Sequence, residues 1–144
     1  MRAPVAAAEW ESDIAYRYGA RLYAQGFFWE AHEVWEAIWK ACPPNGIERR
    51  LLRGLIALAN AALKVRMGRA NAALRLVAEA DALLGEAGAS ARTETVMGVA
   101  VAPLRAAAQA LAAAIRAGGG AGGIGELGRI LRPLDPIANG WTPP

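Results

Sequence analysis

The fold is decided by residues 28–42, which read FWEAHEVWEAIWKAC and are followed by Pro43 and Pro44. At about 100° per residue, the large side chains of this stretch recur on one face of an α-helix. That stripe consists of Phe28, His32, Trp35 and Trp39. Two consecutive prolines end a helix. We therefore predict a helix over 28–42 that buries its aromatic face against neighbouring helices.

Four other stretches show the same helical periodicity. Ser12 and Asn71 suit the cap that precedes a helix, and Pro103 suits a first helical position. The predicted ranges are about 12–26, 47–67, 71–84 and 103–115. The second of these is apolar over more than half of its circumference, so we expect it to be the central helix. The predicted fold class is therefore all-α, a single-domain helical bundle of about five helices.

Residues 118–144 have the composition of a flexible tail rather than of a helix. Seven glycines fall within 118–128 and four prolines within 133–144. Glycine-rich segments are flexible and proline-rich segments are extended. We therefore expect a helical domain over 1–117 and an irregular Gly/Pro-rich tail after it, with a polar loop over 85–98.

The composition is that of one folded domain without disulfides. Of 144 residues, 35 are Ala and 16 are Gly, while apolar residues make up 55% and charged residues 20%. One cysteine, Cys42, excludes a disulfide scaffold, and one histidine, His32, excludes catalytic sites that need two. No stretch reaches the roughly 20 apolar residues of a membrane span, and the first residues do not resemble a secretory signal. We expect a cytoplasmic protein without membrane association.

Arginine dominates the positive charge of the chain. The formal net charge is +3, with 14 Arg against 2 Lys, and the excess is spread along the whole sequence. Only Arg49, Arg50 and Arg53 form a cluster, which disfavours nucleic acid as a partner. In the first turns of a helix these cations oppose the helix dipole. We expect Glu36 or a second chain to offset them.

His32 and Glu36 lie four residues apart, one helical turn from each other, at the edge of the aromatic stripe. Glu33 follows His32 directly and is not expected to face it. A carboxylate beside an imidazole fixes its tautomer and favours its charged form, so the pair suits proton transfer or metal binding. We expect a polar ligand pocket around the pair. Its walls would be Trp35, Trp39 and either Tyr18 or Tyr23.

Two interpretations of the pair remain open. His32 and Glu36 are candidate ligands of a divalent metal, but a zinc site takes three or four protein ligands, so others must come from distant side chains or a second subunit. The conceivable ligands are Asp13, Glu48 and Asn60. Alternatively the pair is structural, in a non-catalytic helical interaction module or a homo-oligomer such as a homodimer. No residue is assigned a catalytic role.

Residues 18–84 resemble an uncharacterised prokaryotic family, domain of unknown function 309. The resemblance rests on GFFWEAHEVWEAIW at 26–39, RGLIALA at 53–59 and RMG at 66–68. The family motif of His, three residues, Glu, two residues and Trp or Tyr falls on His32, Glu36 and Trp39. The resemblance implies an all-helical fold, an intracellular protein and metal binding at this motif. The chain departs from the family at two places, which carry Ala57 in place of Gln and Leu63-Lys64 in place of His.

Overall fold

The computed structural model describes residue 2 and residues 4–144. Six α-helices and two short 3₁₀-helices make up most of this part of the chain, so the predicted all-α class is confirmed in outline. The elements are η1 (Ala7–Ser12), α1 (Ile14–Ala24), α2 (Phe28–Ala41), α3 (Ile47–Arg66), α4 (Ala70–Ser90), β1 (Thr95–Val96), β2 (Val99–Ala100), α5 (Val101–Arg116), α6 (Ala121–Leu131) and η2 (Arg132–Leu134).

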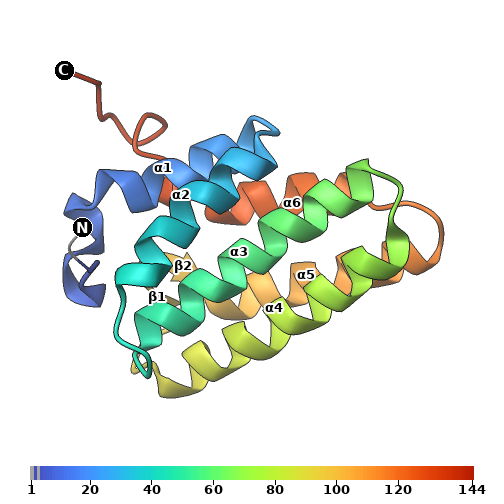
Figure 1. The fold of residues 1–144 in the computed structure, drawn as a ribbon, viewed down its shortest axis with the longest axis horizontal. Coiled ribbons are helices and arrows are strands. Elements are labelled where there is room, and N and C mark those ends of the chain that lie inside the picture. The colour runs from blue at the N-terminus through green and yellow to red at the C-terminus, as the bar shows by residue number, and fades with distance from the viewer. Residues whose placement is uncertain (1, 3) are drawn as a thin grey trace.

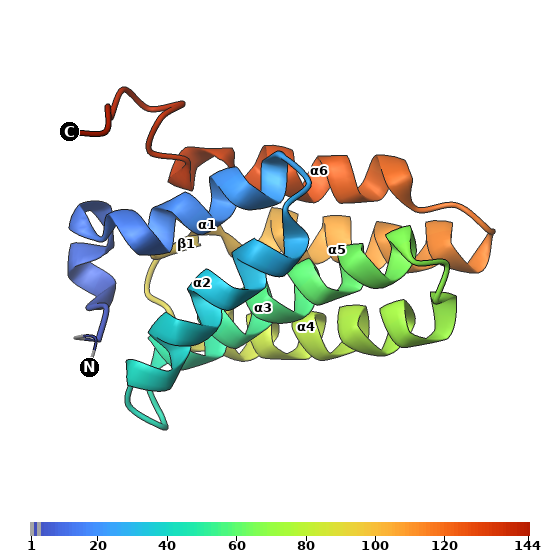
Figure 2. The same cartoon turned by 45° about the horizontal axis from the view of Figure 1, so that its top comes forward.

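Helices that follow one another in the chain pack against one another, and the last helix packs against the first. Each of α2 to α6 packs against the helix before it, and α6 and η2 return to lie beside α1 (Figure 1). Figure 2 shows the two long helices α3 and α4 side by side, with α5 next to α4 and α6 next to α1. Because the last helix contacts the first, α1 is covered on two sides, by α2 and by α6.

The core is centred on α3, as its apolar circumference predicts. This helix contributes nine buried residues, more than any other, and four of its leucines are fully buried. They are Leu51, Leu52, Leu55 and Leu58. None of the helices within residues 2 and 4–144 combines the length and the apolar character that a membrane span requires.

Trp35 holds α1 and α2 together. Its side chain is fully buried, and its indole Nε1 donates a hydrogen bond of 3.0 Å to the backbone oxygen of Tyr16 on α1. A Cβ atom at Gly19 would overlap the indole ring, so only glycine permits this approach. The Tyr16 hydroxyl in turn donates to the Met97 oxygen at 2.9 Å. Burial, and secondarily the charge of Asp13, raise the pKa of that hydroxyl.

The prediction of an irregular tail from residue 118 is wrong for its central part. Residues 121–131 form α6, and Leu127, Leu131 and Leu134 are buried. Glycine lowers helix propensity, but tertiary packing overrides propensity here. A Cβ atom at Gly123 would come within 2.9 Å of the Leu111 side chain, so a glycine lets α6 approach α5 closely. The bundle therefore has one more α-helix than the five expected.

The polar loop predicted over 85–98 is shorter than expected. Helix α4 continues to Ser90, and its internal glycines 85 and 88 make room for the side chains of Arg105 and Val101 on α5. After α4 the chain forms a two-stranded hairpin in which Val96 pairs with Val99. Positive φ angles at both turn residues, Met97 and Gly98, fit a tight hairpin turn.

We expect Gly19→Ala to lower the free energy of unfolding by about 1–3 kcal/mol, because the added methyl group overlaps the Trp35 indole and one of the two must move. Gly122→Ala is the matched control, since a Cβ atom there meets no atom within 4 Å. It should gain about 0.5–1 kcal/mol from the better helix propensity of alanine. Urea denaturation followed by circular dichroism measures both. A Gly19→Ala protein as stable as the wild type would contradict this packing.

Candidate functional site

His32 and Glu36 meet on the outer edge of α2. The Nε2 atom of His32 lies 2.6 Å from Oε2 of Glu36, so the predicted neighbours are in direct contact. The His32 side chain is 14% exposed and that of Glu36 is 33% exposed. The imidazole therefore lies mostly beneath the surface, while the carboxylate reaches solvent.

Glu33 also contacts the imidazole, contrary to the sequence prediction. Its Oε1 lies 3.5 Å from Nδ1 of His32. The helical wheel directs the two side chains about 100° apart, but a glutamate side chain is long enough to turn back toward the preceding residue. His32 thus lies between two carboxylates, and His32, Glu33 and Glu36 can each offer one ligand atom within 4.8 Å of the others.

One nitrogen of His32 lacks a hydrogen bond. Its Nδ1 is buried and has no hydrogen-bond partner in the part of the chain that the structure describes, since the contact with Glu33 is too long for a good one. Buried polar atoms are usually paired. Trp29 covers this region with its ring edge-on to the imidazole, at 5.1 Å between ring centroids.

The two carboxylates open onto a surface hollow of about 720 Å³. It lies between α2 and the N-terminal segment and is lined by Arg2, Pro4, Glu33, Glu36, Ala37, Lys40 and Ala41. Lys40 Nζ lies 3.5 Å from the second carboxylate oxygen of Glu36. A ligand entering this hollow would therefore meet the carboxylates first, with the imidazole behind them.

The predicted aromatic walls do not line this hollow. Trp35 is fully buried and packs against α1. Trp39 is half-buried and its ring faces Arg49, whose Cζ lies 4.1 Å from the ring centroid. Tyr23 is buried and donates its hydroxyl to the Ile124 oxygen on α6 at 3.1 Å, and Tyr18 is half-buried on α1. Sequence periodicity placed Trp35 and Trp39 on one face of α2, but Trp35 contacts α1 whereas Trp39 contacts Arg49 on α3.

Of the more distant ligands conceived from the sequence, Asp13 and Glu48 do not join the group around His32. Among the described residues, the group of three on α2 is the one set of His, Cys, Asp and Glu side chains close enough to share an ion. Asp13 instead accepts hydrogen bonds from Arg2 and from the Tyr16 backbone. Burial raises the pKa of the Cys42 thiol, which donates to the Ile38 oxygen. That is the opposite of what a thiolate ligand or nucleophile needs.

The positive charges of Arg49 and Arg53, at the start of α3, are balanced by other groups than the sequence predicted. Arg49 Nη1 donates to the backbone oxygens of Trp39 and Cys42, at 3.2 and 2.9 Å, and Arg53 pairs with Glu79 on α4. Neither interaction involves Glu36. Because α2 and α3 are joined by a tight turn, the negative end of the α2 dipole lies beside the first turns of α3 and neutralises Arg49.

One family model matches part of the chain. Residues 16–76 match the family model described as "Domain of unknown function (DUF309)", which confirms the family resemblance seen in the sequence. The matched segment runs from α1 into α4 and includes all of α2 and α3. No curated protein and no solved structure matches the chain significantly.

We expect Arg49→Met to lower the free energy of unfolding by about 1–3 kcal/mol, because it removes two charge-assisted hydrogen bonds to the end of α2 and the contact with Trp39. Arg50→Met is the matched control, since the Arg50 side chain makes no ion pair within the described residues. Its effect should stay within about 0.5 kcal/mol. Urea denaturation measures the free energy of unfolding of both variants. Equal losses for Arg49→Met and Arg50→Met would contradict a stabilising role of the Arg49 contacts.

Proposed function

We propose that the protein binds a divalent metal ion on α2 through His32, Glu36 and Glu33. The observation that carries this proposal is the partly buried imidazole held between two carboxylates, with its buried Nδ1 atom left without a hydrogen bond. One imidazole and two carboxylates form a donor set that suits zinc, manganese or iron. The two negative charges of the carboxylates would balance the charge of the ion.

The donor set of this proposal leaves the ion partly open to the hollow. Three protein ligands complete neither a tetrahedral nor an octahedral shell, so water or a small polar ligand would take the remaining positions. The α3 position that often carries Gln in the family holds Ala57 here, which is buried and has no donor atom. The metal would supply Lewis acidity when bound. The proposal assigns binding and no reaction, in a protein we still predict to be cytoplasmic.

We expect untagged protein to bind one Zn²⁺ or Mn²⁺ per chain in isothermal titration calorimetry. His32→Ala and Glu36→Gln should abolish the binding, because each removes a ligand from the group on α2. Glu30→Gln is the matched control, since Glu30 is exposed on the same helix and lies outside that group. It should bind as the wild type does.

Thermal unfolding separates this proposal from a purely structural His32–Glu36 pair. A ligand that binds only the folded state stabilises it by about 2.7 kcal/mol at a hundred times its Kd. Saturating metal should therefore raise the Tm of the wild type and of Glu30→Gln, and leave that of His32→Ala unchanged. Absence of binding in the wild type, or binding that survives His32→Ala, would overturn the metal site and favour the structural pair.

An exposed apolar patch supports a second candidate, a helical interaction module that forms a homodimer. Phe27, Trp29 and Met67 are each about half exposed, at 49%, 55% and 49%. Phe27 lies in the α1–α2 connection, Trp29 in the first turn of α2, and Met67 in the α3–α4 connection. Arg66, at the end of α3, joins the two connections by donating to the Gly26 oxygen at 2.6 Å. Exposed aromatic and Met side chains are enriched at protein interfaces.

If this patch pairs two copies, the mass measured by sedimentation equilibrium should rise toward a dimer with protein concentration. Trp29→Ser should abolish that rise, because it removes the most exposed side chain of the patch. Trp141→Ser is the control, since Trp141 is half-buried in the C-terminal segment, outside the patch. A monomer at every concentration, or equal dimerisation of the two variants, would exclude a dimer through this surface.

A further inference from the structure

A second cavity, of about 620 Å³, lies between α1, α6 and the segment after η2. It shares no lining residue with the hollow beside Glu33 and Glu36. Its volume falls within the roughly 300–1,000 Å³ of typical ligand pockets. The cavity exists because α6 returns to α1, and it contains residues of the segment for which the sequence predicted a flexible tail.

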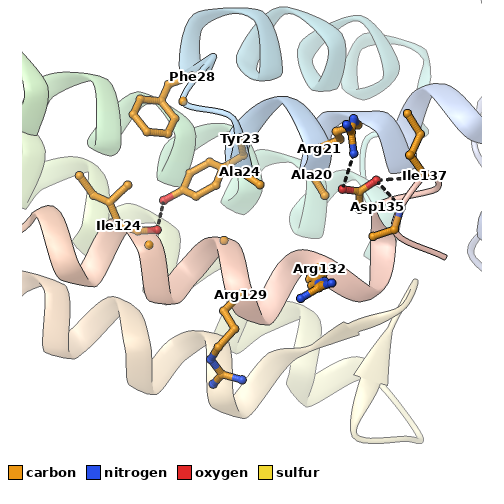
Figure 3. Close-up of a pocket in the computed structure, with 14 residues that line it drawn as sticks. Ala20, Arg21, Tyr23, Ala24, Phe28, Ile124, Arg129, Arg132, Asp135 and Ile137 are labelled. Atoms are coloured by element: carbon orange, nitrogen blue, oxygen red, sulfur yellow. Dashed lines mark hydrogen bonds and ion pairs between the residues drawn. The ribbon is translucent and has the colours of Figure 1, made fainter.

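One end of this cavity is apolar. Figure 3 shows Phe28, Tyr23 and Ile124 gathered at that end, from α2, α1 and α6 respectively. The rings of Tyr23 and Phe28 contact each other, with 5.0 Å between their centroids. The Tyr23 hydroxyl is occupied by its bond to the Ile124 oxygen, so this end offers aromatic and aliphatic surface to a ligand.

The other end of the cavity carries the charged groups (Figure 3). Asp135 is buried and already satisfied, because it accepts hydrogen bonds from the backbone of Ile137 and Ala138 and pairs with Arg21 at 3.4 Å. Arg132 also lines the cavity and is exposed. Its side chain makes no ion pair or hydrogen bond within residues 2 and 4–144. The polar end therefore has a surplus of positive charge.

Two residues of α6 that line the cavity, Gly125 and Gly128, have no side chain that would fill it. A Cβ atom at Gly128 would lie 3.4 Å from the Tyr23 ring, an ordinary contact. A Cβ atom at Gly125 would meet nothing within 4 Å, although a glycine inside a helix costs about 0.5–1 kcal/mol relative to alanine. Packing against other helices does not explain Gly125, whereas the open cavity above it leaves room for a ligand.

We propose that this cavity binds a small amphipathic carboxylate. Its apolar body would pack on Tyr23, Phe28 and Ile124, and its carboxylate would lie at the charged end, where Arg132 is free to form a charge-assisted hydrogen bond. A neutral apolar ligand would leave the surplus positive charge uncompensated. A polyanion would find only one guanidinium without a carboxylate partner among those that line the cavity, since Arg21 pairs with Asp135 and Arg129 pairs with Glu126.

Octanoate and its neutral analogue octanamide are suitable probes, titrated below the concentration at which octanoate forms micelles. We expect saturable binding of octanoate to the wild type in isothermal titration calorimetry, and binding of octanamide weaker by about tenfold or more. Arg132→Gln should weaken octanoate binding by a similar factor and leave octanamide unaffected. Arg116→Gln, an exposed arginine of α5 outside the cavity, controls for the change in net charge.

A matched pair of glycine variants tests the location of the ligand. Gly125→Leu fills the cavity from its floor and should abolish octanoate binding. Gly122→Leu adds the same side chain to the same helix at an exposed position outside the cavity, and should bind octanoate as the wild type does. Both variants replace a helical glycine, so neither should lower the Tm. Absence of saturable binding, equal binding of octanoate and octanamide, or equal binding by the two glycine variants would overturn the proposal.

Discussion

The structure depends on the fit of the Trp35 indole against Gly19. This contact sets how closely α1 approaches α2, and the bond from the indole to the Tyr16 oxygen fixes its orientation. Because Tyr16 also bonds to the hairpin at Met97, one buried cluster joins three separate segments. The outer edge of α2 then presents His32 to the surface, while α1 presents Tyr23 toward α6. Both candidate sites therefore rest on the same contact between α1 and α2.

Local pattern was enough to predict the first half of the fold. The helix over residues 28–42, its termination at Pro43 and the contact between His32 and Glu36 all follow from helical periodicity, which involves only neighbouring residues. The contact of Glu33 was missed because a helical wheel describes Cα positions, whereas the reach of a glutamate depends on its rotamers. Helical periodicity thus predicted the contact between His32 and Glu36, but it did not predict that the Glu33 side chain also reaches the imidazole.

Helix α6 could not be predicted in this way, because it is stabilised by distant contacts, whereas local pattern did predict α5. Glycines disfavour a helix locally, but tertiary packing overrides this preference in α6, where Gly123 allows a close approach to α5. The cavity depends on such contacts too, since Arg21 meets Asp135 across 114 residues of sequence. One signal in the sequence did indicate α6. Within the glycine-rich segment, apolar residues recur at helical spacing, at Ile124, Leu127 and Leu131.

The arginines of this chain act mainly as internal donors that connect separate elements. Seven of the 14 bond or pair with a carboxylate or a backbone oxygen of a different segment: Arg2, Arg17, Arg21, Arg49, Arg53, Arg66 and Arg105. Arginine suits this use because its planar group offers five donors and stays charged. These arginines are dispersed over the chain, and each connects its own pair of segments. Within the cavity between α1 and α6, Arg132 stands apart from this pattern, because it is the guanidinium whose donors are left for a ligand.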